Sequence, residues 1–265
     1  SPGAAMAGAM SEYIFNCPEC LAEYKKQNQV YLGTGSSPTY IMLCTKEVRT
    51  LEDLKGKKYR SGAANFGRWA EHFGGVKVSI PGNDIYEAMG QGVVDCAMLS
   101  ATELTNLSLF DITKFVTRRI PGGVFAGIAT NNFNVDVWQG LSTKERQVVL
   151  RASAKMQADL TWKYYSEAQK NLDASPGKGI EVIEPTAEIM AESDKFVKGD
   201  LAVIEKQFTT DYGVSNAAAK IEQVTKLVEK WKTLTADIAD DPKALEKLYW
   251  DEVFSKIDAA TFGMK

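Results

Sequence analysis

Arg60 is the residue whose type and position point most directly to chemistry in this 265-residue sequence. It ends the stretch Lys57–Arg60, which is too short for a helix and is predicted to be a strand, and a helical pattern follows after Ser61–Gly62. A guanidinium at such a place can bind a carboxylate through two parallel hydrogen bonds, and the dipole of the following helix favours an anion there. A surface salt bridge to a nearby Asp or Glu is the alternative, and spacing alone does not decide between the two.

Two aromatic residues follow Arg60 within the helical pattern. Phe66 and Trp69 lie about one turn apart, so they either line the wall of a pocket or pack the helix on a sheet. We expect at least one of them to belong to the core.

The four cysteines offer a second kind of chemistry. Cys17-Pro-Glu-Cys20 is a C-x-x-C motif, which acts as a redox pair when it follows a strand in a thioredoxin-like unit. Here a helical stretch precedes it, and a metal site would need further ligands, so an incidental thiol pair or a local disulfide is favoured. Cys44 and Cys96 lie in separate apolar, strand-like runs and are expected to be buried core thiols.

Other catalytic and cofactor motifs are missing from the sequence. His72 is the single histidine, which excludes most metal sites. There is no glycine-rich phosphate loop and no G-x-S-x-G nucleophile motif. Most carboxylates lie at helix caps or on charged helix faces. We therefore expect no enzyme activity, no metal and no cofactor.

The stretch from Thr50 to Cys96 has the pattern that would position Arg60. It predicts a β-α-β-α-β order, in which Asn83 or Asp84 caps the last helix. The elements expected after Thr50 are a helical turn at Leu51–Leu54 closed by Gly56, a strand at Lys57–Arg60, a helix at Ala63–Phe73, a strand at Val76–Ile80, a helix at Ile85–Met89 and a strand at Val93–Ala97. Arg60 would then lie at the carboxyl end of a strand, where open α/β sheets bind ligands.

The second half of the chain is mostly helical. Ser142-Thr-Lys-Glu145 is a capping box that opens a helical pattern running to about Leu172. This is longer than an ordinary domain helix, so we expect it to span the molecule or to bend. A strand at Ile180–Ile183 and further helices follow.

Composition excludes several classes of function. The net charge of −3 gives no reason to expect a nucleic-acid or acidic-membrane partner. No apolar run is long enough to span a membrane. The first ten residues lack the basic segment of an intact signal peptide.

Three motifs carry a resemblance to a known family. They are TLEDLKGKKYR at Thr50–Arg60, IYEAMGQGVVD at Ile85–Asp95, and the turn N-x-D-x-W-x-x-L-S at Asn134–Ser142. In this order and spacing they resemble the substrate-binding proteins of TRAP transporters, the DctP family, over most of residues 10–235. The resemblance implies an α/β fold of the two-lobed, type II periplasmic-binding-protein kind, in which each lobe is a sheet flanked by helices and a long helix spans both lobes.

The resemblance also implies a division of the chain. Lobe I would comprise residues 1–37 and 125–165, with its N-terminal βαβ part missing from this sequence. Lobe II would comprise residues 38–124 and 166–265 with the C-terminal helices. The chain would cross between lobes near Ser37–Tyr40 and Gly123–Phe125.

The implied function is that of a periplasmic receptor which binds a small organic acid between its lobes and delivers it to a TRAP membrane permease. Arg60 would form a salt bridge with the carboxylate, and Tyr40, Phe66, Asn83 and Ser100 would line the pocket. Leu99 and Ser100 stand where many sialic-acid and dicarboxylate binders carry an Asn, and Tyr40 stands where some members carry a second arginine. We therefore do not expect sialic acid. An enzyme on the same scaffold and a thiol redox protein using Cys17 and Cys20 are the alternatives.

Overall fold

The computed structural model describes residues 1–128 and 131–264. The chain divides into two compact units. Unit 1 comprises Ser1–Pro38, Val124–Ser166 and Ala218–Lys265, and unit 2 comprises Thr39–Gly123 and Glu167–Ala217. The sequence placed residues 166–265 together in one lobe, and the structure groups residues 218–265 with unit 1 instead.

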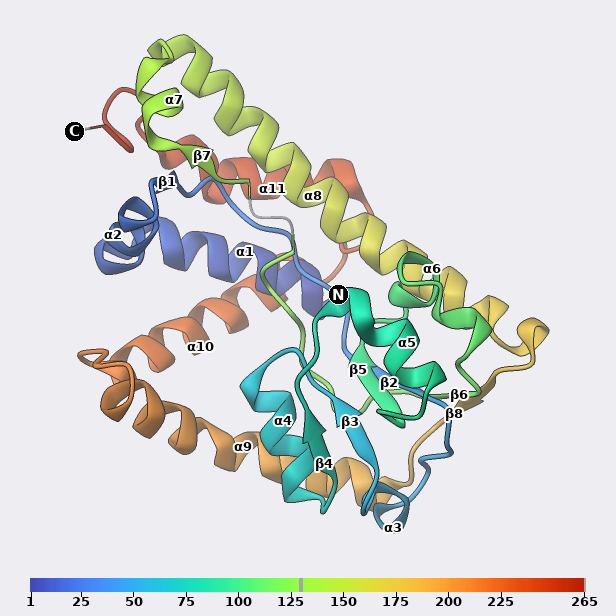
Figure 1. The fold of residues 1–265 in the computed structure, drawn as a ribbon. Helices are drawn as coiled ribbons and strands as arrows, with labels where there is room; N and C mark the ends of the chain where they lie inside the picture. Colours follow the sequence, from blue (N-terminus) through green and yellow to red (C-terminus); the bar gives the residue numbers. More distant parts are fainter. Residues whose placement is uncertain (129–130, 265) are drawn as a thin grey trace. The chain divides into compact units, whose positions relative to one another are not determined.

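Unit 2 is built on a mixed sheet (Figure 1). Within the described residues, its strands follow the order β4-β3-β5-β2-β6-β8, and they are β2 (Ile41–Cys44), β3 (Lys58–Arg60), β4 (Val76–Val78), β5 (Cys96–Leu99), β6 (Phe115–Thr117) and β8 (Glu181–Ile183). Strand β3 pairs in parallel with both β4 and β5, whereas β2 is antiparallel to β5 and β6. The helices of the unit are α3 (Leu51–Leu54), α4 (Ala64–His72), α5 (Ile85–Gly90), α6 (Glu103–Asn106), the end of α8 (Thr143–Ala174) and α9 (Ala187–Thr210), with short 3-10 turns at Gly82–Asp84, Leu109–Asp111 and Pro176–Lys178.

Both faces of this sheet are covered. All of β2 is buried, and its residues alternate between two apolar clusters because successive side chains of a strand point to opposite faces. Ile41 and Leu43 pack with residues of α5 and α6, and Met42 packs with residues of α4 and α9. An all-apolar strand such as β2 is therefore what a two-sided core requires.

The expected β-α-β-α-β order over Thr50–Cys96 is confirmed. Thr50 caps α3 through a capping box with Asp53, and Gly56 takes the left-handed conformation (φ +69°) that closes it. The last strand begins three residues later than predicted, at Cys96. The amides of Val93 and Val94 both donate to the carbonyl of Ala88, which holds these two valines in the turn that ends α5.

The cysteines are paired in two disulfides, Cys17–Cys20 and Cys44–Cys96. Cys44 and Cys96 face each other directly in the antiparallel β2–β5 pair and are fully buried. The expected burial of Cys44 and Cys96 is confirmed, but the expectation that they are thiols was wrong. Predicting the disulfide requires the register of two strands that are far apart in sequence. Cys17 is the N-cap of α2 (Pro18–Lys26), so Cys17–Cys20 closes the first turn of that helix.

Helix α9 is fastened to α4 by polar contacts. Arg68 Nε and Nη2 donate to the two carboxylate oxygens of Asp200, each at 2.7 Å, and Trp69 Nε1 donates to Ser193 Oγ at 2.8 Å. Asp200 and Ser193 are buried. These contacts determine which side of α9 faces the rest of unit 2.

Unit 1 contains a short sheet and most of the remaining helices. Its elements are α1 (Pro2–Phe15), α2, β1 (Gln29–Val30), β7 (Phe133–Asn134), α7 (Val135–Gly140), residues 143–166 of α8, α10 (Ala217–Leu234), α11 (Pro242–Glu252) and a 3-10 turn at Phe254–Lys256. Strands β1 and β7 are antiparallel.

The small residues of α1 allow the C-terminal helices to pack closely against it. The indole of Trp231 in α10 lies so near Gly8 that a β-carbon there would be 2.2 Å from the ring. Trp231 is fully buried, and its Nε1 donates to Glu12 Oε2 at 2.7 Å. Tyr249 of α11 donates its hydroxyl to the Ala4 carbonyl. These contacts explain why residues 218–265 belong to unit 1.

The predicted capping box of the long helix is confirmed, because Ser142 N donates to Glu145 Oε2 at 2.7 Å and Glu145 N donates to Ser142 Oγ at 3.3 Å. Helix α8 runs on to Ala174, so its last residues, 167–174, belong to unit 2.

Membrane-spanning character is not found in the described residues, where every helix is either too short or too polar to cross a bilayer.

Candidate functional site

Arg60 is the last residue of β3, at the carboxyl end of the strand, as predicted. Strand β5 runs parallel beside it, with Arg60 opposite Ala97, so the segment after β5 emerges at the same edge of the sheet. Ser100 is the first residue of that segment. The topology of unit 2 therefore brings the ends that carry Arg60 and Ser100 to one edge.

The Arg60 side chain is only 8% exposed. Its Nε donates to the Ile80 carbonyl at 3.1 Å, and among the described residues it forms no salt bridge. Gly62 lies against the guanidinium, since a β-carbon at this glycine would be 3.0 Å from Nη1 and 3.2 Å from Nη2. The alternative that the sequence left open, a surface salt bridge from Arg60 to a nearby Asp or Glu, is therefore not found among the described residues.

The charge of Arg60 is held in a partly desolvated environment. Burial lowers the pKa of its guanidinium, and the neighbouring Tyr40 and Glu103 oppose this effect. An arginine keeps its proton at neutral pH even so, because its ordinary pKa lies far above neutral pH. Unit 2 therefore holds a cation that has lost much of its water and has no ion-pair partner among the residues described, which favours an external anion.

Glu103, at the start of α6, is a charged neighbour of Arg60 that the sequence did not predict. Burial raises the pKa of its carboxyl, the hydrogen bond with Asn106 and the charge of Arg60 lower it, and Glu167 raises it further. No motif marks Glu103, since it resembles the other carboxylates at helix starts. Its relation to Arg60 depends on the fold alone.

Tyr40 and Phe66 stack, with ring centroids 4.8 Å apart and an interplanar angle of 21°. Phe66 is only 4% exposed and belongs to the same apolar cluster as the fully buried Met42. Trp69, one turn further along α4, is also buried in this cluster. Phe66 consequently packs the core and at the same time supports Tyr40, which lies near Arg60.

Ser100 is 1% exposed, and its hydroxyl has no hydrogen-bond partner in the described part of the chain. Buried hydroxyl groups are usually hydrogen-bonded, so such a group calls for a water molecule or a ligand.

Asn83 differs from the other four predicted site residues. It is exposed in the 3-10 turn before α5, it makes no hydrogen bond among the residues described, and the N-cap position of α5 is Asp84. No hydrogen bond among the described residues links Asn83 to Arg60 or to the other predicted site residues.

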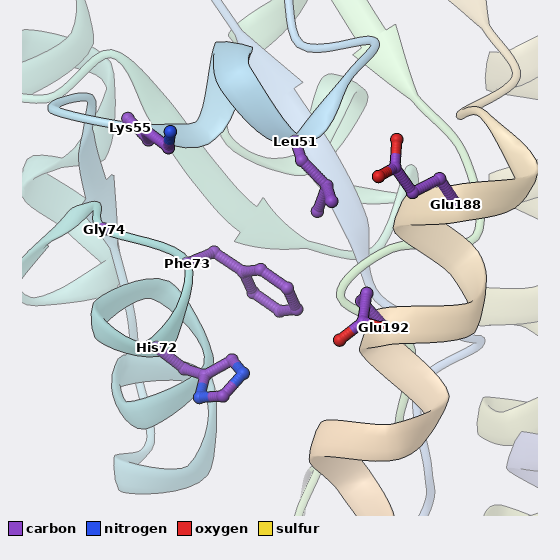
Figure 2. Close-up of a pocket in the computed structure, with 7 residues that line it drawn as sticks. All are labelled: Leu51, Lys55, His72, Phe73, Gly74, Glu188 and Glu192. Carbon is purple, nitrogen blue, oxygen red and sulfur yellow. The ribbon is translucent and has the colours of Figure 1, made fainter.

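A separate surface pocket of about 540 Å³ lies elsewhere on unit 2 (Figure 2). Its lining residues are Leu51, Lys55, His72, Phe73, Gly74, Glu188 and Glu192. In Figure 2 the His72 and Phe73 side chains point toward the first turns of α9, which carry the two glutamates. Glu192 is in contact with Lys195, at 3.6 Å. Among the described residues, no cluster of His, Cys, Asp and Glu is suited to a metal ion.

Comparison with known proteins identifies the family. A sequence profile of the bacterial extracellular solute-binding protein family 7, DctP, matches residues 10–207. The chain belongs to the DctP family. Members of this family are solute-binding proteins and not enzymes, so the enzyme alternative is not retained.

A curated relative, a solute-binding protein of Albidiferax ferrireducens, is 27% identical over 171 residues, which cover 64% of this chain and 48% of the relative. The chain thus spans about half the length of that relative.

Solved structures show the same fold. One is a TRAP solute-binding protein from an unidentified microbe of a marine metagenome, specific for aromatic acids and bound to metahydroxyphenylacetate. It is 17% identical, with a TM-score of 0.72 over 86% of this chain and 71% of its own. Another, from Rhodoferax ferrireducens and bound to copurified benzoate, is 17% identical, with a TM-score of 0.70 over 88% of this chain and 71% of its own. At this level of identity, the similarity shows that this DctP chain has the α/β fold of two-lobed TRAP solute-binding proteins.

Proposed function

We propose that this chain is the ligand-binding part of a periplasmic receptor that holds a small organic carboxylate on Arg60 and delivers it to a TRAP-type membrane permease. The observation that carries the proposal is the state of Arg60, which is nearly buried at a strand end and has no salt bridge among the described residues. A ligand carboxylate would supply the missing partner through charge-assisted hydrogen bonds.

An aromatic carboxylate is the ligand class that the neighbourhood of Arg60 fits best. The half-buried ring of Tyr40, which stacks on the buried Phe66, provides a flat apolar group close to the guanidinium. Aromatic rings pack well against such a surface in offset or tilted arrangements. The buried Ser100 hydroxyl could accept or donate a hydrogen bond to a polar group of the ligand. The two solved relatives described above bind aromatic acids, which supports the same class here.

The periplasmic location is supported by the family, which is extracellular by description, and by the two disulfides. Disulfides persist in oxidising compartments and are rare in the cytosol. In this proposal units 1 and 2 are the two lobes of the receptor, and α8, which contributes residues to both, is the long helix that connects them.

A binding screen tests the proposal directly. Thermal-shift measurements with benzoate, metahydroxyphenylacetate, mandelate and non-aromatic organic acids should reveal a stabilising ligand, whose affinity is then measured by calorimetry. Arg60→Met keeps much of the side-chain length but removes the charge, and it should cost about 2–5 kcal/mol of binding free energy. Arg118→Met is the matched control, because Arg118 pairs with Glu184 at the surface of the same unit.

If Arg60→Met bound the same acid as tightly as the wild type, the role of Arg60 would be wrong. If no carboxylate bound the wild-type chain, whereas a neutral or cationic solute did, the carboxylate class would be wrong.

A further inference from the structure

The Cys17–Cys20 disulfide is a feature that the proposed ligand site does not use. It lies in unit 1, at the first turn of α2, whereas Arg60 lies in unit 2. The two cysteines are three positions apart, so their bond closes a very short loop and removes little conformational entropy from the unfolded chain. Cys44 and Cys96 are 52 positions apart, and their bond constrains the unfolded chain more strongly. Stabilisation thus explains the bond between β2 and β5 better than the bond in α2.

The two disulfides also differ in their access to solvent. Cys44 and Cys96 are both 0% exposed. Cys17 is 5% exposed, whereas Cys20 is half-buried and follows two exposed residues. Thiol–disulfide exchange begins when a thiolate attacks one of the two sulfurs, so access decides where it can begin. Cys20 is therefore the cysteine that an external thiolate reaches most easily.

Cys17 is placed to receive the negative charge when the bond breaks. It is the N-cap of α2, and its Sγ accepts a hydrogen bond from the backbone N–H of Cys20 at 3.2 Å. A thiolate at Cys17 would keep this hydrogen bond and would lie at the positive end of the helix dipole, which stabilises it. Glu19, the acidic residue of the first turn, is paired with Lys220 at 3.4 Å, so its charge is balanced. Because a sulfur leaves faster when its thiolate is stabilised, attack on Cys20 should expel Cys17.

Helix α2 does not need the disulfide to keep its place. Its first turn is closed by the backbone hydrogen bond from Leu21 N to the Cys17 carbonyl at 3.0 Å, and Pro18 at the first helical position presets the helical φ. Further along the helix, the ring of Tyr24 packs against that of Tyr31, with centroids 5.0 Å apart. The reduced form therefore keeps both the helix and the cap that stabilises a Cys17 thiolate. A disulfide whose reduced form is stabilised is easily reduced.

We propose that Cys17–Cys20 is a redox-active site that exchanges reversibly with an external dithiol while Cys44–Cys96 remains oxidised. One thiolate of the dithiol attacks Sγ of Cys20 and forms a mixed disulfide, and the electron pair of the broken S–S bond leaves on Cys17. The second thiolate of the dithiol then attacks the dithiol's own sulfur in the mixed disulfide and releases Cys20. Two electrons pass from the dithiol to the cysteine pair, and the two protons of the dithiol go to solvent or to the new thiolates. The inference does not depend on the ligand proposed for Arg60.

Reduction of the folded, full chain by dithiothreitol tests the proposal. The chain is incubated for a fixed time with graded ratios of reduced to oxidised dithiothreitol near neutral pH, quenched with acid and alkylated, and mass spectrometry then identifies the cysteines that were free. Cys17 and Cys20 should become alkylated at a ratio roughly tenfold or more below that required for Cys44 and Cys96, which are the internal control. Circular dichroism of the chain in which only the first pair is reduced should match that of the oxidised chain.

The position of a mixed disulfide tests the direction of attack. Glutathione has a single thiol and cannot release itself from the adduct, so the adduct can be trapped with acid and located by tandem mass spectrometry. It should be found on Cys20. An adduct on Cys17, a Cys17–Cys20 bond that opens no earlier than Cys44–Cys96, or a loss of helix when only Cys17–Cys20 is reduced would each overturn the proposal.

Discussion

Gly62→Ala should weaken ligand binding without removing any group that touches the ligand. The added methyl group would lie 3.0 Å from Nη1, 3.2 Å from Nη2 and 3.3 Å from Cζ of Arg60. Comfortable contacts of carbon with such atoms are about 3.5 Å or longer, so the guanidinium has to move by a few tenths of an ångström.

The guanidinium cannot make this movement freely. Arg60 Nε is hydrogen-bonded to the Ile80 carbonyl at 3.1 Å, and a shift of several tenths of an ångström away from Gly62 stretches or misaligns that bond. A hydrogen bond of this kind contributes about 0.5–1.5 kcal/mol. If about 1 kcal/mol of it is lost from the bound state, affinity for the carboxylate falls roughly fivefold.

Calorimetric titration of wild type and Gly62→Ala with the tightest acid from the screen measures this effect. Gly90→Ala is the matched control, because a β-carbon at Gly90 meets no atom within 4 Å. An affinity of Gly62→Ala within twofold of wild type, in a protein whose binding is abolished by Arg60→Met, would refute the reasoning. It would mean that the close contact with Gly62 does not fix the guanidinium in the bound state.

Three further predictions concern other parts of the chain. Gly8→Ala brings a methyl group to 2.2 Å from the buried indole of Trp231, so overpacking of about 1–3 kcal/mol should outweigh the roughly 1 kcal/mol that alanine gains in a helix, and urea unfolding should show a net loss of stability. Glu103→Gln should tighten binding of an anionic ligand about threefold to tenfold near neutral pH, because it removes a negative charge close to the binding arginine. In the wild type, binding should tighten as the pH falls toward the pKa of Glu103, which burial raises, and the Gln variant should lack this dependence in calorimetry at several pH values. The double variant Cys17→Ser with Cys20→Ser should bind the ligand within twofold of wild type, whereas a large loss of binding would favour the thiol alternative.

Local sequence patterns predicted the position of Arg60, because that position depends only on elements that are neighbours in sequence. A helical turn closed by Gly56, a strand of a few residues and the helix after it were enough to place Arg60 at a strand end. These elements follow from capping, periodicity and glycine conformation, each of which acts over a few residues.

Relations between distant segments could not be read in this way. Glu103 and Arg60 come together only because β5 aligns in parallel with β3, and the sequence does not state that register. The Arg68–Asp200 pair joins residues 132 positions apart. The assignment of α10 to unit 1 depends on the fit of a tryptophan against a glycine of α1, whereas the charge pattern of α10 indicates only an amphipathic helix.

The disulfide between β2 and β5 has a consequence for the binding edge at the other end of these strands. Cys44 and Cys96 form one end of the pair, and Ile41 and Leu99 form the other, where Tyr40 directly precedes Ile41 and Ser100 directly follows Leu99. A slip of one residue in a strand pair turns every side chain to the opposite face. Once the disulfide has formed, such a slip is covalently excluded. The bond therefore fixes the register of β2 and β5, which places Tyr40 and Ser100 at the same end of the strand pair. A chain that pairs these strands out of register cannot close this bond, so only chains with the correct alignment of β2 and β5 carry it.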